Sequence, residues 1–232
     1  MRTSLRNYGK RALYQMFRYC IRQAIKDITL YEQIEALRDS AAFVREHLAQ
    51  SRGFRDQREI MDFALSQVSV AGAYLEFGVF RGESLNYIAQ KMPDTTVHGF
   101  DSFVGLPEDW RPGYPRGMFK INDVSALSFA PNVEIHRGWF SESLPAFTKS
   151  LTQDIAFLHV DSDLYSSAVD IFWWLRDRLI KGSVILFDEY YNHPGWREGE
   201  HKAFCEFAES TGRKFRYIAH NLTSEQVAVA LD

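Results

Sequence analysis

Cysteine and long apolar runs are scarce in this chain of 232 residues. The two cysteines, Cys20 and Cys205, are too few for a disulfide framework, and no Cys/His spacing is typical of a zinc site. We expect no signal peptide, and no apolar run is long enough to span a bilayer. The sequence therefore predicts a cytoplasmic protein of one domain, long enough to bury a large core.

Acidic residues are missing from residues 1–26, which carry seven Lys or Arg side chains. The apolar residues of this segment fall on one side of a helix, at Leu13, Met16, Phe17, Cys20, Ile21 and Ile25. A basic amphipathic helix can pack against its own domain or a second copy of the chain, or lie on an anionic membrane. We expect packing, and with it a homo-oligomer formed through the N-terminal helices. Peripheral membrane contact through residues 1–26 is the alternative.

Positive charge forms no stripe in the second half of the chain, so we expect no nucleic-acid partner. The pattern is helical from about residue 10 to 68, and strand-like runs then alternate with helical ones. The strand-like runs cover residues 73–79, 96–101, 133–138, 155–161 and 183–189. Such alternation predicts an α/β fold with a mostly parallel sheet and helices on both faces. Two further strands, 214–220 and 227–231, are joined by a short turn and should pair antiparallel.

We therefore predict two parts, an N-terminal helical arm over residues 1–68 and a Rossmann-like catalytic domain over residues 69–232. The segment YLEFGVFRGES, residues 74–84, is the first ligand motif of the second part. Its glycines at 78 and 82 permit a tight turn and close approach of a ligand. Glu76 stands where a dinucleotide-binding loop has its first glycine, and its charge would repel a pyrophosphate. The cationic S-adenosylmethionine fits this turn better than NAD, and an ordinary strand-to-helix turn is the alternative.

Further cofactor contacts are predicted where the next strands end. Asp101 lies about 20 residues beyond the glycine turn, where an acid accepts ribose hydroxyls, and Ser102 can add a hydrogen bond. Alone, Asp101 would equally suit a helix cap. In RGWF, residues 137–140, an aromatic ring can stack on adenine or pack in the core. The predicted cofactor contacts are Glu76, Gly78, Val79, Phe80, Gly82, Ser84, Asp101, Ser102, Gly138, Trp139, Phe140 and Asp161.

Two apolar strands run directly into acids, in FLHVDSDLYSS (157–167) and SVILFDEYYNH (183–193). One helix and one strand separate Asp161 from Asp188, so both should lie at the carboxyl edge where open α/β sheets bind ligands. Buried carboxylates without a cation are costly, and an oxygen-only ligand set suits Mg²⁺. We predict a Mg²⁺ site of Asp161, Asp188 and Glu189, and we expect Asp163 to cap a helix that begins at Leu164. Capping and salt-bridging throughout is the alternative.

These motifs resemble the macrocin and mycinamicin O-methyltransferase group of class I S-adenosylmethionine-dependent methyltransferases. The resemblance rests on YLEFGVFRGES, the FDSFVGLPE run at 100–108, HVDSDLYSS and FDEYYNHPGWREGEHKAF, and covers about residues 70 to 230. It implies a seven-stranded sheet with a reversed last strand, and methyl transfer to sugar hydroxyls on natural products. It also implies cofactor contacts by Glu76, Gly78 and Asp101 and the Mg²⁺ ligands predicted above. The family often has two aspartates where this chain has Asp188 and Glu189, so the longer Glu189 departs from the pattern.

The predicted reaction is Mg²⁺-assisted methyl transfer to a hydroxyl of a sugar or glycosylated small molecule. Asp161 and His193 are the predicted catalytic residues, with His193 as general base because it follows the metal acids. A lone loop histidine is more often structural. The loop 103–120 is expected to close over the acceptor. Predicted acceptor contacts are Trp110, Arg111 and Tyr114 on this loop, and Tyr165, Tyr190 and Tyr191 elsewhere.

Three other functions are open at the level of sequence. A catechol-type aromatic O-methyltransferase would use the same metal geometry, and only acceptor screening separates it from a sugar enzyme. A nicotinamide-dependent dehydrogenase is disfavoured by Glu76 in the glycine turn. A non-catalytic, membrane-associated nucleotide-binding module would use the basic helix, but it would have no need of the metal acids.

Overall fold

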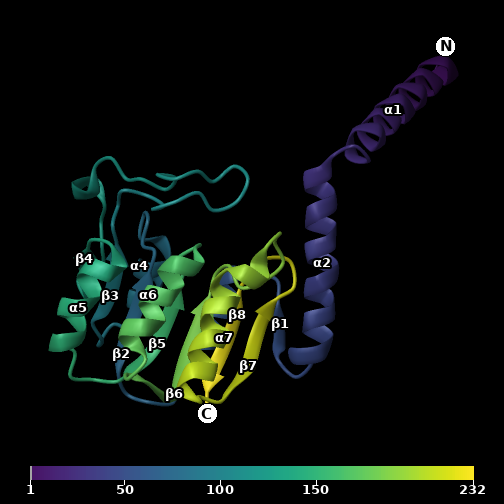
Figure 1. Ribbon diagram of the computed structural model, residues 1–232. Coiled ribbons are helices and arrows are strands. Elements are labelled where there is room, and N and C mark those ends of the chain that lie inside the picture. The colour runs from purple at the N-terminus through teal and green to yellow at the C-terminus, as the bar shows by residue number, and fades with distance from the viewer. Residues whose placement is uncertain (1) are drawn as a thin grey trace.

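An eight-stranded sheet with the order β1-β7-β8-β6-β5-β2-β3-β4 forms the centre of the protein (Figure 1). The computed structural model describes residues 2–232, with the side chains of residues 10 and 12–232. The strands are β1 (Arg52–Phe54), β2 (Ala73–Phe77), β3 (Val97–Asp101), β4 (Val133–Arg137), β5 (Ile155–Val160), β6 (Leu179–Phe187), β7 (Phe215–Asn221) and β8 (Val227–Leu231). Strands β2 to β6 are mutually parallel, and β8 runs antiparallel to both β6 and β7.

The seven predicted strands are all present, and the reversed last strand is confirmed by the antiparallel pairing of β8. The eighth strand, β1, pairs parallel with β7 inside a segment that was predicted to be helical. That prediction is wrong at β1. The strand has three residues, of which only Phe54 is buried, so it is too short to show an alternating pattern.

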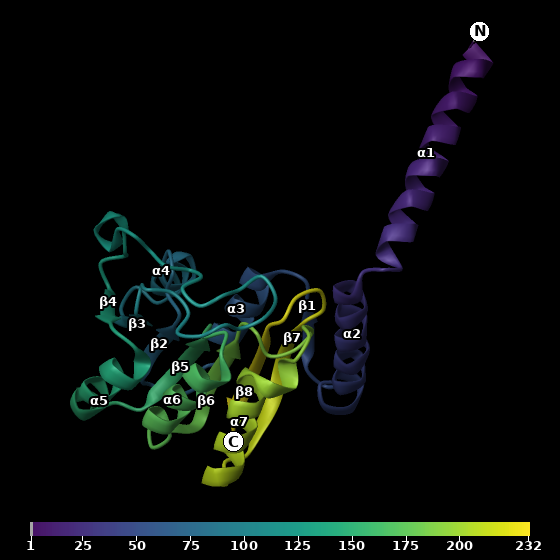
Figure 2. The same cartoon turned by 45° about the horizontal axis from the view of Figure 1, so that its top comes forward.

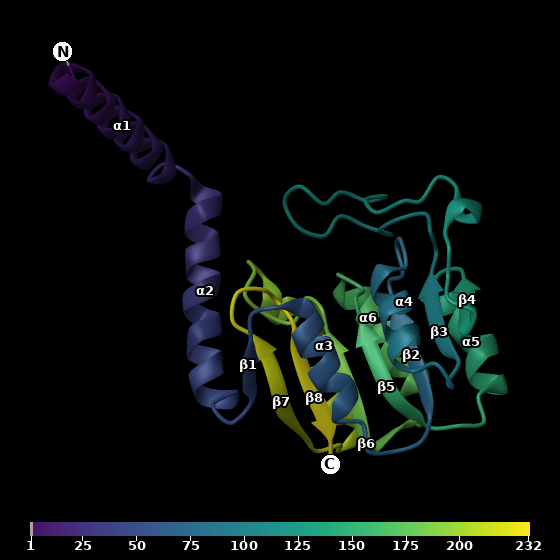
Figure 3. The same cartoon turned by 180° about the vertical axis from the view of Figure 1, so that it is seen from behind.

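Two layers of helices cover the sheet, with α5, α6 and α7 on one face and α3 and α4 on the other (Figures 1 and 3). Because both faces are covered, every residue of β2, β5 and β8 is buried. The helices are α1 (Arg2–Ala24), α2 (Ile28–His47), α3 (Gln57–Ser66), α4 (Glu83–Lys91), α5 (Phe140–Ser150), α6 (Tyr165–Leu175) and α7 (Glu200–Thr211), with the short 3₁₀ helices η1 (Val124–Ala126) and η2 (Trp196–Glu198).

The first two helices differ in how much they contact the sheet domain. Helix α2 lies beside the β1 and β7 edge and buries Ala36 and Phe43 in the core that α5, α6 and α7 share with the sheet. Helix α1 extends away from the sheet, and Leu13 and Phe17 are each 62% exposed (Figures 1 and 2). No described helix is long and apolar enough to cross a bilayer.

The division of the chain at residue 68 stays a prediction, but part of the predicted arm packs on the sheet. Strand β1 extends the sheet at one edge. Ile60, Met61 and Ala64 of α3 are buried in the core on the α4 face. In packing terms, residues 52–66 therefore belong with the sheet.

Candidate active site

The loop that joins β3 to β4 passes over one edge of the sheet (Figures 1 and 2). A cavity of about 670 Å³ lies at that edge, at the carboxyl ends of β2, β3, β5 and β6, and this loop contributes to its lining. This is the edge at which open α/β sheets bind ligands. Most of the predicted site residues line it, and they come from both the cofactor set and the acidic set. They are Gly78, Phe80, Asp101, Ser102, Trp110, Arg111, Tyr114, Gly138, Trp139, Phe140, Asp161, Asp188 and Glu189.

The glycine turn between β2 and α4 is shaped by crowding and by Asp101. Gly78 has a φ of +93°, and a Cβ there would stand 1.7 Å from the carbonyl oxygen of Asp161, so no side chain fits. Asp101 Oδ2 accepts hydrogen bonds from the Val79 and Phe80 amides at 2.9 and 2.8 Å. Asp101 Oδ1 also accepts a hydrogen bond from the Phe103 amide at 2.6 Å. Asp101 therefore holds the turn, while its carboxylate lines the cavity and keeps one acceptor position for a ligand.

Glu76 lies beneath the cavity and does not line it. Its carboxylate accepts a hydrogen bond from Ser84 Oγ at 3.1 Å and pairs with His159 Nδ1 at 2.9 Å, with no exposed surface. Val79, Gly82 and Ser84 also lie outside the lining. Together with Glu76, these predicted cofactor residues belong to the turn and its surroundings and do not face the cavity. The physical reason is that side chains alternate between the two faces along β2. Glu76 therefore points to the face that α4 covers, where it meets Ser84.

His159 supplies the positive charge that balances these buried acids, and sequence reasoning missed it. Burial alone would lower the pKa of His159, but the nearby Asp188 and Glu76 carboxylates outweigh burial and raise the pKa well above its usual value. His159 Nδ1 pairs with Glu76, whereas Nε2 is buried without a hydrogen-bond partner, 3.9 Å from Asp188 Oδ1. Its signal in the sequence was a single titratable residue inside the otherwise apolar strand IAFLHV.

Three carboxylates form an oxygen-only cluster in the cavity wall. Asp161, Asp163 and Glu189 each offer one oxygen, and these oxygens lie within 4.8 Å of one another. Burial, followed by the charge of Asp188, raises the pKa of Asp161 and Glu189 well above their usual values. Burial also raises the pKa of Asp163 to about 7. Glu189 Oε2 is buried without a hydrogen-bond partner. Such a donor set fits a hard divalent cation, which would stabilise the ionised forms.

The cluster differs from the predicted ligand set in one member. Asp163 was expected to cap a helix, but α6 begins at Tyr165, and its N-cap Leu164 has no side-chain cap. That prediction is wrong, because Asp163 adopts a left-handed φ of +63° and lines the cavity. Asp188 also lines the cavity, but its Oδ1 accepts a hydrogen bond from Gln226 Nε2 at 3.0 Å and faces His159. The Asp188 carboxylate therefore already has partners outside the three-carboxylate cluster.

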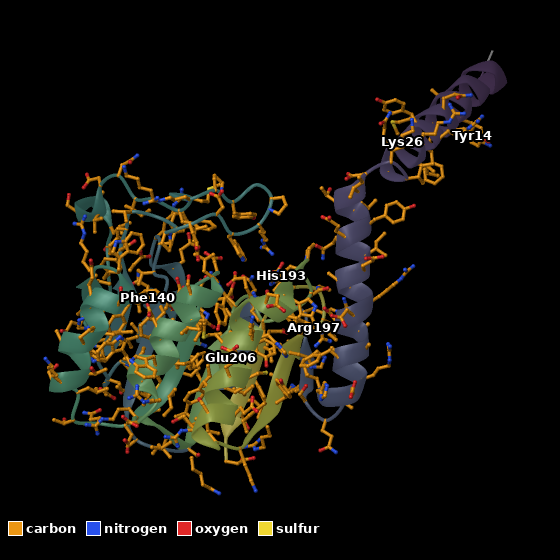
Figure 4. The ribbon with its side chains drawn as sticks, viewed as in Figure 1. Tyr14, Lys26, Phe140, His193, Arg197 and Glu206 are labelled. Carbon is orange, nitrogen blue, oxygen red and sulfur yellow. The ribbon has the colours of Figure 1, made fainter. Side chains whose placement is uncertain are left out.

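His193 lies outside the cavity lining, which does not support its predicted role as general base. The ring is 4% exposed, and its two nitrogens lie 3.1 Å from the Pro194 carbonyl oxygen and 3.4 Å from that of Glu189. Burial lowers the pKa of His193. In Figure 4 the side chain lies above the end of α7, in the loop that follows β6. The Trp110 ring lies edge-on to the imidazole, with ring centres 6.1 Å apart.

The three tyrosines predicted to contact the acceptor also turn away from the cavity, so the structure does not support that role. Tyr165 donates a hydrogen bond to Glu206 Oε2 on α7 at 2.7 Å. The Tyr190 hydroxyl lies 2.8 Å from that of Tyr217, and the Tyr191 hydroxyl donates to the Asn221 carbonyl, both inside the core. The register of α6 instead presents Ser166, Ser167 and Asp170 to the cavity, and sequence reasoning missed all three.

The loop over the cavity is tied down on two sides. Arg111 Nη1 donates to both carboxylate oxygens of Glu225 at 3.1 and 3.0 Å, and its guanidinium lies 3.9 Å from the Trp110 ring centre. Ser166 Oγ donates to Glu108 Oε1 at 2.7 Å on the other side. Glu225 belongs to the turn between β7 and β8, so the loop is closed by partners far away in sequence.

Comparisons with known proteins identify the family and the fold. Residues 48–211 match the model of the family described as Macrocin-O-methyltransferase (TylF). The demethyldecarbamoylnovobiocin O-methyltransferase of Streptomyces niveus is 27% identical over 165 residues, which cover 61% of this chain and 62% of the relative. The 8-demethyl-8-(2,3-dimethoxy-alpha-L-rhamnosyl)-tetracenomycin-C 4'-O-methyltransferase of Streptomyces olivaceus is 28% identical over 143 residues, or 52% and 54% of the two chains. The chain thus matches less than two thirds of either relative's length.

Two solved structures share the fold. The calicheamicin methyltransferase CalS11 superposes with a TM-score of 0.62 at 22% identity, over 87% of this chain and 91% of its own. The O-methyltransferase NovP gives 0.55 at 24% identity, over 74% and 78%. The family match alone covers well over half of the chain, including the glycine turn, the acidic cluster and the loop between them. The chain therefore belongs to the macrocin O-methyltransferase (TylF) family, with a class I methyltransferase fold.

Proposed function

We propose that this chain is an S-adenosylmethionine-dependent O-methyltransferase that acts on a hydroxyl of a sugar or glycosylated small molecule, with Mg²⁺ in its site. One observation carries the proposal. A single cavity is lined by the glycine turn with Asp101 and Trp139, and also by the cluster of Asp161, Asp163 and Glu189. The names of both curated relatives describe O-methyltransferases, and one of them acts on a rhamnosyl-bearing compound.

The cofactor half of the cavity suits S-adenosylmethionine. The bare backbone at Gly78 allows close approach, and Asp101 is the acid proposed to accept the ribose hydroxyls. Trp139 and Phe140 provide ring faces for the adenine. The neighbouring carboxylates attract a sulfonium, whereas they would repel a pyrophosphate.

The acceptor half is proposed to hold the metal and the sugar. Asp161 and Glu189 are the proposed Mg²⁺ ligands, joined by Asp163 or Asp188 beside them. S-adenosylmethionine supplies an electrophilic methyl group, and bound Mg²⁺ supplies Lewis-acid polarisation of the acceptor oxygen. Trp110 offers a ring face to the acceptor, and the loop that carries it covers part of the site.

Methyl transfer then requires little from the side chains beyond positioning. The acceptor hydroxyl oxygen forms a bond to the methyl carbon as the carbon–sulfur bond breaks, which leaves a neutral thioether. The hydroxyl proton passes to a carboxylate of the cluster or to water, because these are the bases in reach of the cavity.

Calorimetric titration tests this function directly. S-adenosylhomocysteine is titrated into the full chain with Mg²⁺ and with EDTA, and Mg²⁺ is titrated separately. We expect both to bind, and Mg²⁺ affinity to fall by at least about tenfold in Asp161→Asn and Glu189→Gln. Asp170→Asn, which also alters a cavity-lining carboxylate, should keep normal Mg²⁺ affinity.

The outcomes separate the alternatives. Failure to bind S-adenosylhomocysteine would overturn the methyltransferase proposal, and binding of it with no Mg²⁺ uptake would overturn the metal. Comparing Asp163→Asn with Asp188→Asn identifies the third ligand. Methylation of catechols but not of glycosides, in an acceptor panel with labelled S-adenosylmethionine, would favour the aromatic alternative.

We also propose that α1 rests on an anionic membrane surface. Leu13, Met16 and Phe17 are at least 58% exposed on one side of the helix, and no described part of the chain covers them. Residues 1–26 contain no acid, so a second copy of α1 would bring like charges together, whereas anionic headgroups complement them. A homo-oligomer formed through the same apolar stripe is the alternative outcome of the test. Part of the basic charge, such as that of Arg6 and Arg11, lies on side chains outside the described ones.

A further inference from the structure

A second group of metal-binding side chains lies on the outer strands of the sheet. His98 is on β3, and Glu134 and His136 are on the neighbouring strand β4, which is an edge strand. In the β3–β4 register His98 stands directly opposite Glu134, and His136 is two residues further along β4. Side chains two residues apart on a strand share a face, so all three side chains project from one face of these two strands.

The donor atoms already have the spacing of a metal site. His98 Nδ1 lies 3.1 Å from His136 Nε2 and 3.6 Å from Glu134 Oε2, and His136 Nε2 lies 3.8 Å from Glu134 Oε1. Zinc binds nitrogen and oxygen ligands at roughly 2.0–2.2 Å in a tetrahedron, which spaces the donors roughly 3.3–3.5 Å apart. Shifts of a few tenths of an ångström would therefore bring the three donors to ligand distance.

The surroundings of the cluster leave room for a further ligand. The Phe147 ring of α5 packs against both imidazoles, with ring centres 5.1 Å from His98 and 4.9 Å from His136, which limits their motion. A second cavity, of about 1020 Å³, opens beside the three donors. It is lined by residues that precede β2, β3 and β5, by β4 and by α5, so it lies on the α5 face of the sheet and extends to the amino ends of these strands. Water or an external ligand can reach the cluster from this cavity.

We propose that His98, Glu134 and His136 form a binding site for a divalent transition ion of the zinc class. Two imidazoles and one carboxylate suit zinc and its neighbours, whereas the oxygen-only cluster at the carboxyl edge suits magnesium. The site joins the edge strand β4 to β3 through side chains as well as through backbone hydrogen bonds. Because β4 leads directly into Gly138 and Trp139, the ion also steadies the segment that lines the candidate active site.

Equilibrium dialysis of the full chain against Zn²⁺, followed by metal analysis, tests this site without reference to catalysis. We expect one equivalent of Zn²⁺ that excess Mg²⁺ does not displace, and visible absorption of a four-coordinate ion when Co²⁺ is used instead. Glu134→Gln should weaken Zn²⁺ binding by at least about tenfold. This variant keeps its fold, because the Glu134 side chain is 59% exposed. His136→Gln should abolish binding, and the exposed His47→Gln should leave it unchanged.

Three results would contradict the proposed zinc site. The proposal is wrong if Zn²⁺ does not bind stoichiometrically, or if binding survives in both Glu134→Gln and His136→Gln. Loss of Zn²⁺ in Asp161→Asn, with retention in Glu134→Gln, would assign the ion to the other cluster. None of these results depends on whether the chain transfers methyl groups.

Discussion

Gly78 is the residue with the least freedom to change in the candidate site. Its φ of +93° is costly for any other residue, and a Cβ would meet the Asp161 carbonyl oxygen at 1.7 Å. Left-handed backbone costs a non-glycine residue roughly 1–2 kcal/mol, and crowding against backbone adds about 1–3 kcal/mol. We therefore expect Gly78→Ala to lower the free energy of unfolding by about 3 kcal/mol and to abolish S-adenosylhomocysteine binding. Denaturant unfolding and calorimetry measure the two effects.

Gly212 provides the control for that substitution. It ends α7 with a φ of +66°, and a Cβ there would meet nothing within 4 Å. Gly212→Ala should therefore show the backbone cost alone, about 1 kcal/mol, with normal cofactor affinity. Equal destabilisation by the two substitutions would mean that the close approach to Asp161 relaxes without cost.

His201 should make the fold sensitive to acid. Burial and the nearby Arg197 lower the pKa of His201 to about 4, whereas the unfolded chain has the ordinary value of about 6.5. Below pH 6.5 His201 binds a proton in the unfolded state but not in the folded state. The free energy of unfolding therefore falls between pH 6.5 and about 4. We expect a loss of about 2 kcal/mol over this range, allowing for solvent screening.

The measurement compares stability at pH 7 and pH 4.5 in three proteins. In His201→Gln the difference between the two pH values should shrink by about that amount, whatever the substitution does to stability at pH 7. Gly212→Ala, which alters the end of the same helix without changing a titratable group, should keep the wild-type difference. An unchanged difference in His201→Gln would show that other groups control acid sensitivity.

Single residues of the site were predictable where they directly follow a parallel strand. Asp161, Asp188 and Glu189 were placed at the cavity because residues that follow parallel strands meet at one edge. Asp163 was misread, because its direction depends on a left-handed φ that no local pattern signals. His193 was misread for a similar reason, since the path of a short loop decides whether a side chain is buried.

The loop between β3 and β4 depends on its tie to the β7–β8 turn. Arg111 and Glu225 are each 22% exposed in their side chains and form two short hydrogen bonds. A single nitrogen, Nη1, makes both hydrogen bonds, and the planar guanidinium also stacks on the Trp110 ring; lysine keeps the charge but loses this stacking. We expect Arg111→Lys to shift the closed loop toward the open state by about 1 kcal/mol, and chymotrypsin to cut the loop roughly fivefold faster. KM for the acceptor should rise with kcat little changed.

A matched pair elsewhere separates this effect from general destabilisation. Arg197 donates to both carboxylate oxygens of Asp39 at 2.8 and 2.9 Å, and so ties η2 to α2 away from the cavity. Arg197→Lys should leave loop cleavage and KM unchanged. If both substitutions accelerate cleavage equally, the Arg111 pair has no specific role in closure.

At the level of elements, the long apolar strands and the helices between them were predictable from periodicity. Strand β1 was not, because three residues carry too little pattern. The face of α6 that points to the cavity could not be predicted from the sequence either. Its YSSAVD start offers both Tyr165 and Ser166 as contacts, and only packing against α7 turns the tyrosine outward. Glu225 gave no signal, because its role depends on a partner 114 residues away.

For the whole molecule, the proposed membrane contact predicts selective binding to anionic vesicles. The full chain should sediment with phosphatidylglycerol vesicles but not with phosphatidylcholine vesicles, and salt should weaken binding. Each basic side chain near the surface contributes about 1 kcal/mol, so Arg18→Gln with Arg22→Gln should weaken binding roughly 30-fold. Leu13→Ser with Phe17→Ser should weaken it by removing apolar contact.

The oligomeric state must be measured on the same samples. The chain could fail to bind anionic vesicles and elute as a dimer, with Leu13→Ser and Phe17→Ser together converting the dimer to a monomer. That result would mean that a second copy of the chain covers the apolar side of α1. Arg197→Lys is the control for both assays, since it alters a basic residue on the sheet domain and not on α1. Its vesicle binding and elution should match those of the unmodified chain.

The fold class, and the meeting of two acid-bearing strand ends at the ligand edge, were predictable from the sequence alone. These follow from local patterns, because apolar periodicity specifies each element and parallel strands must end at one edge. The tertiary structure alone decided which side chains face the cavity. It turned Asp163 inward, buried Glu76 against His159, closed the loop through Glu225 and brought His98, Glu134 and His136 together. Those contacts join residues from separate elements, so their geometry exists only after the elements pack.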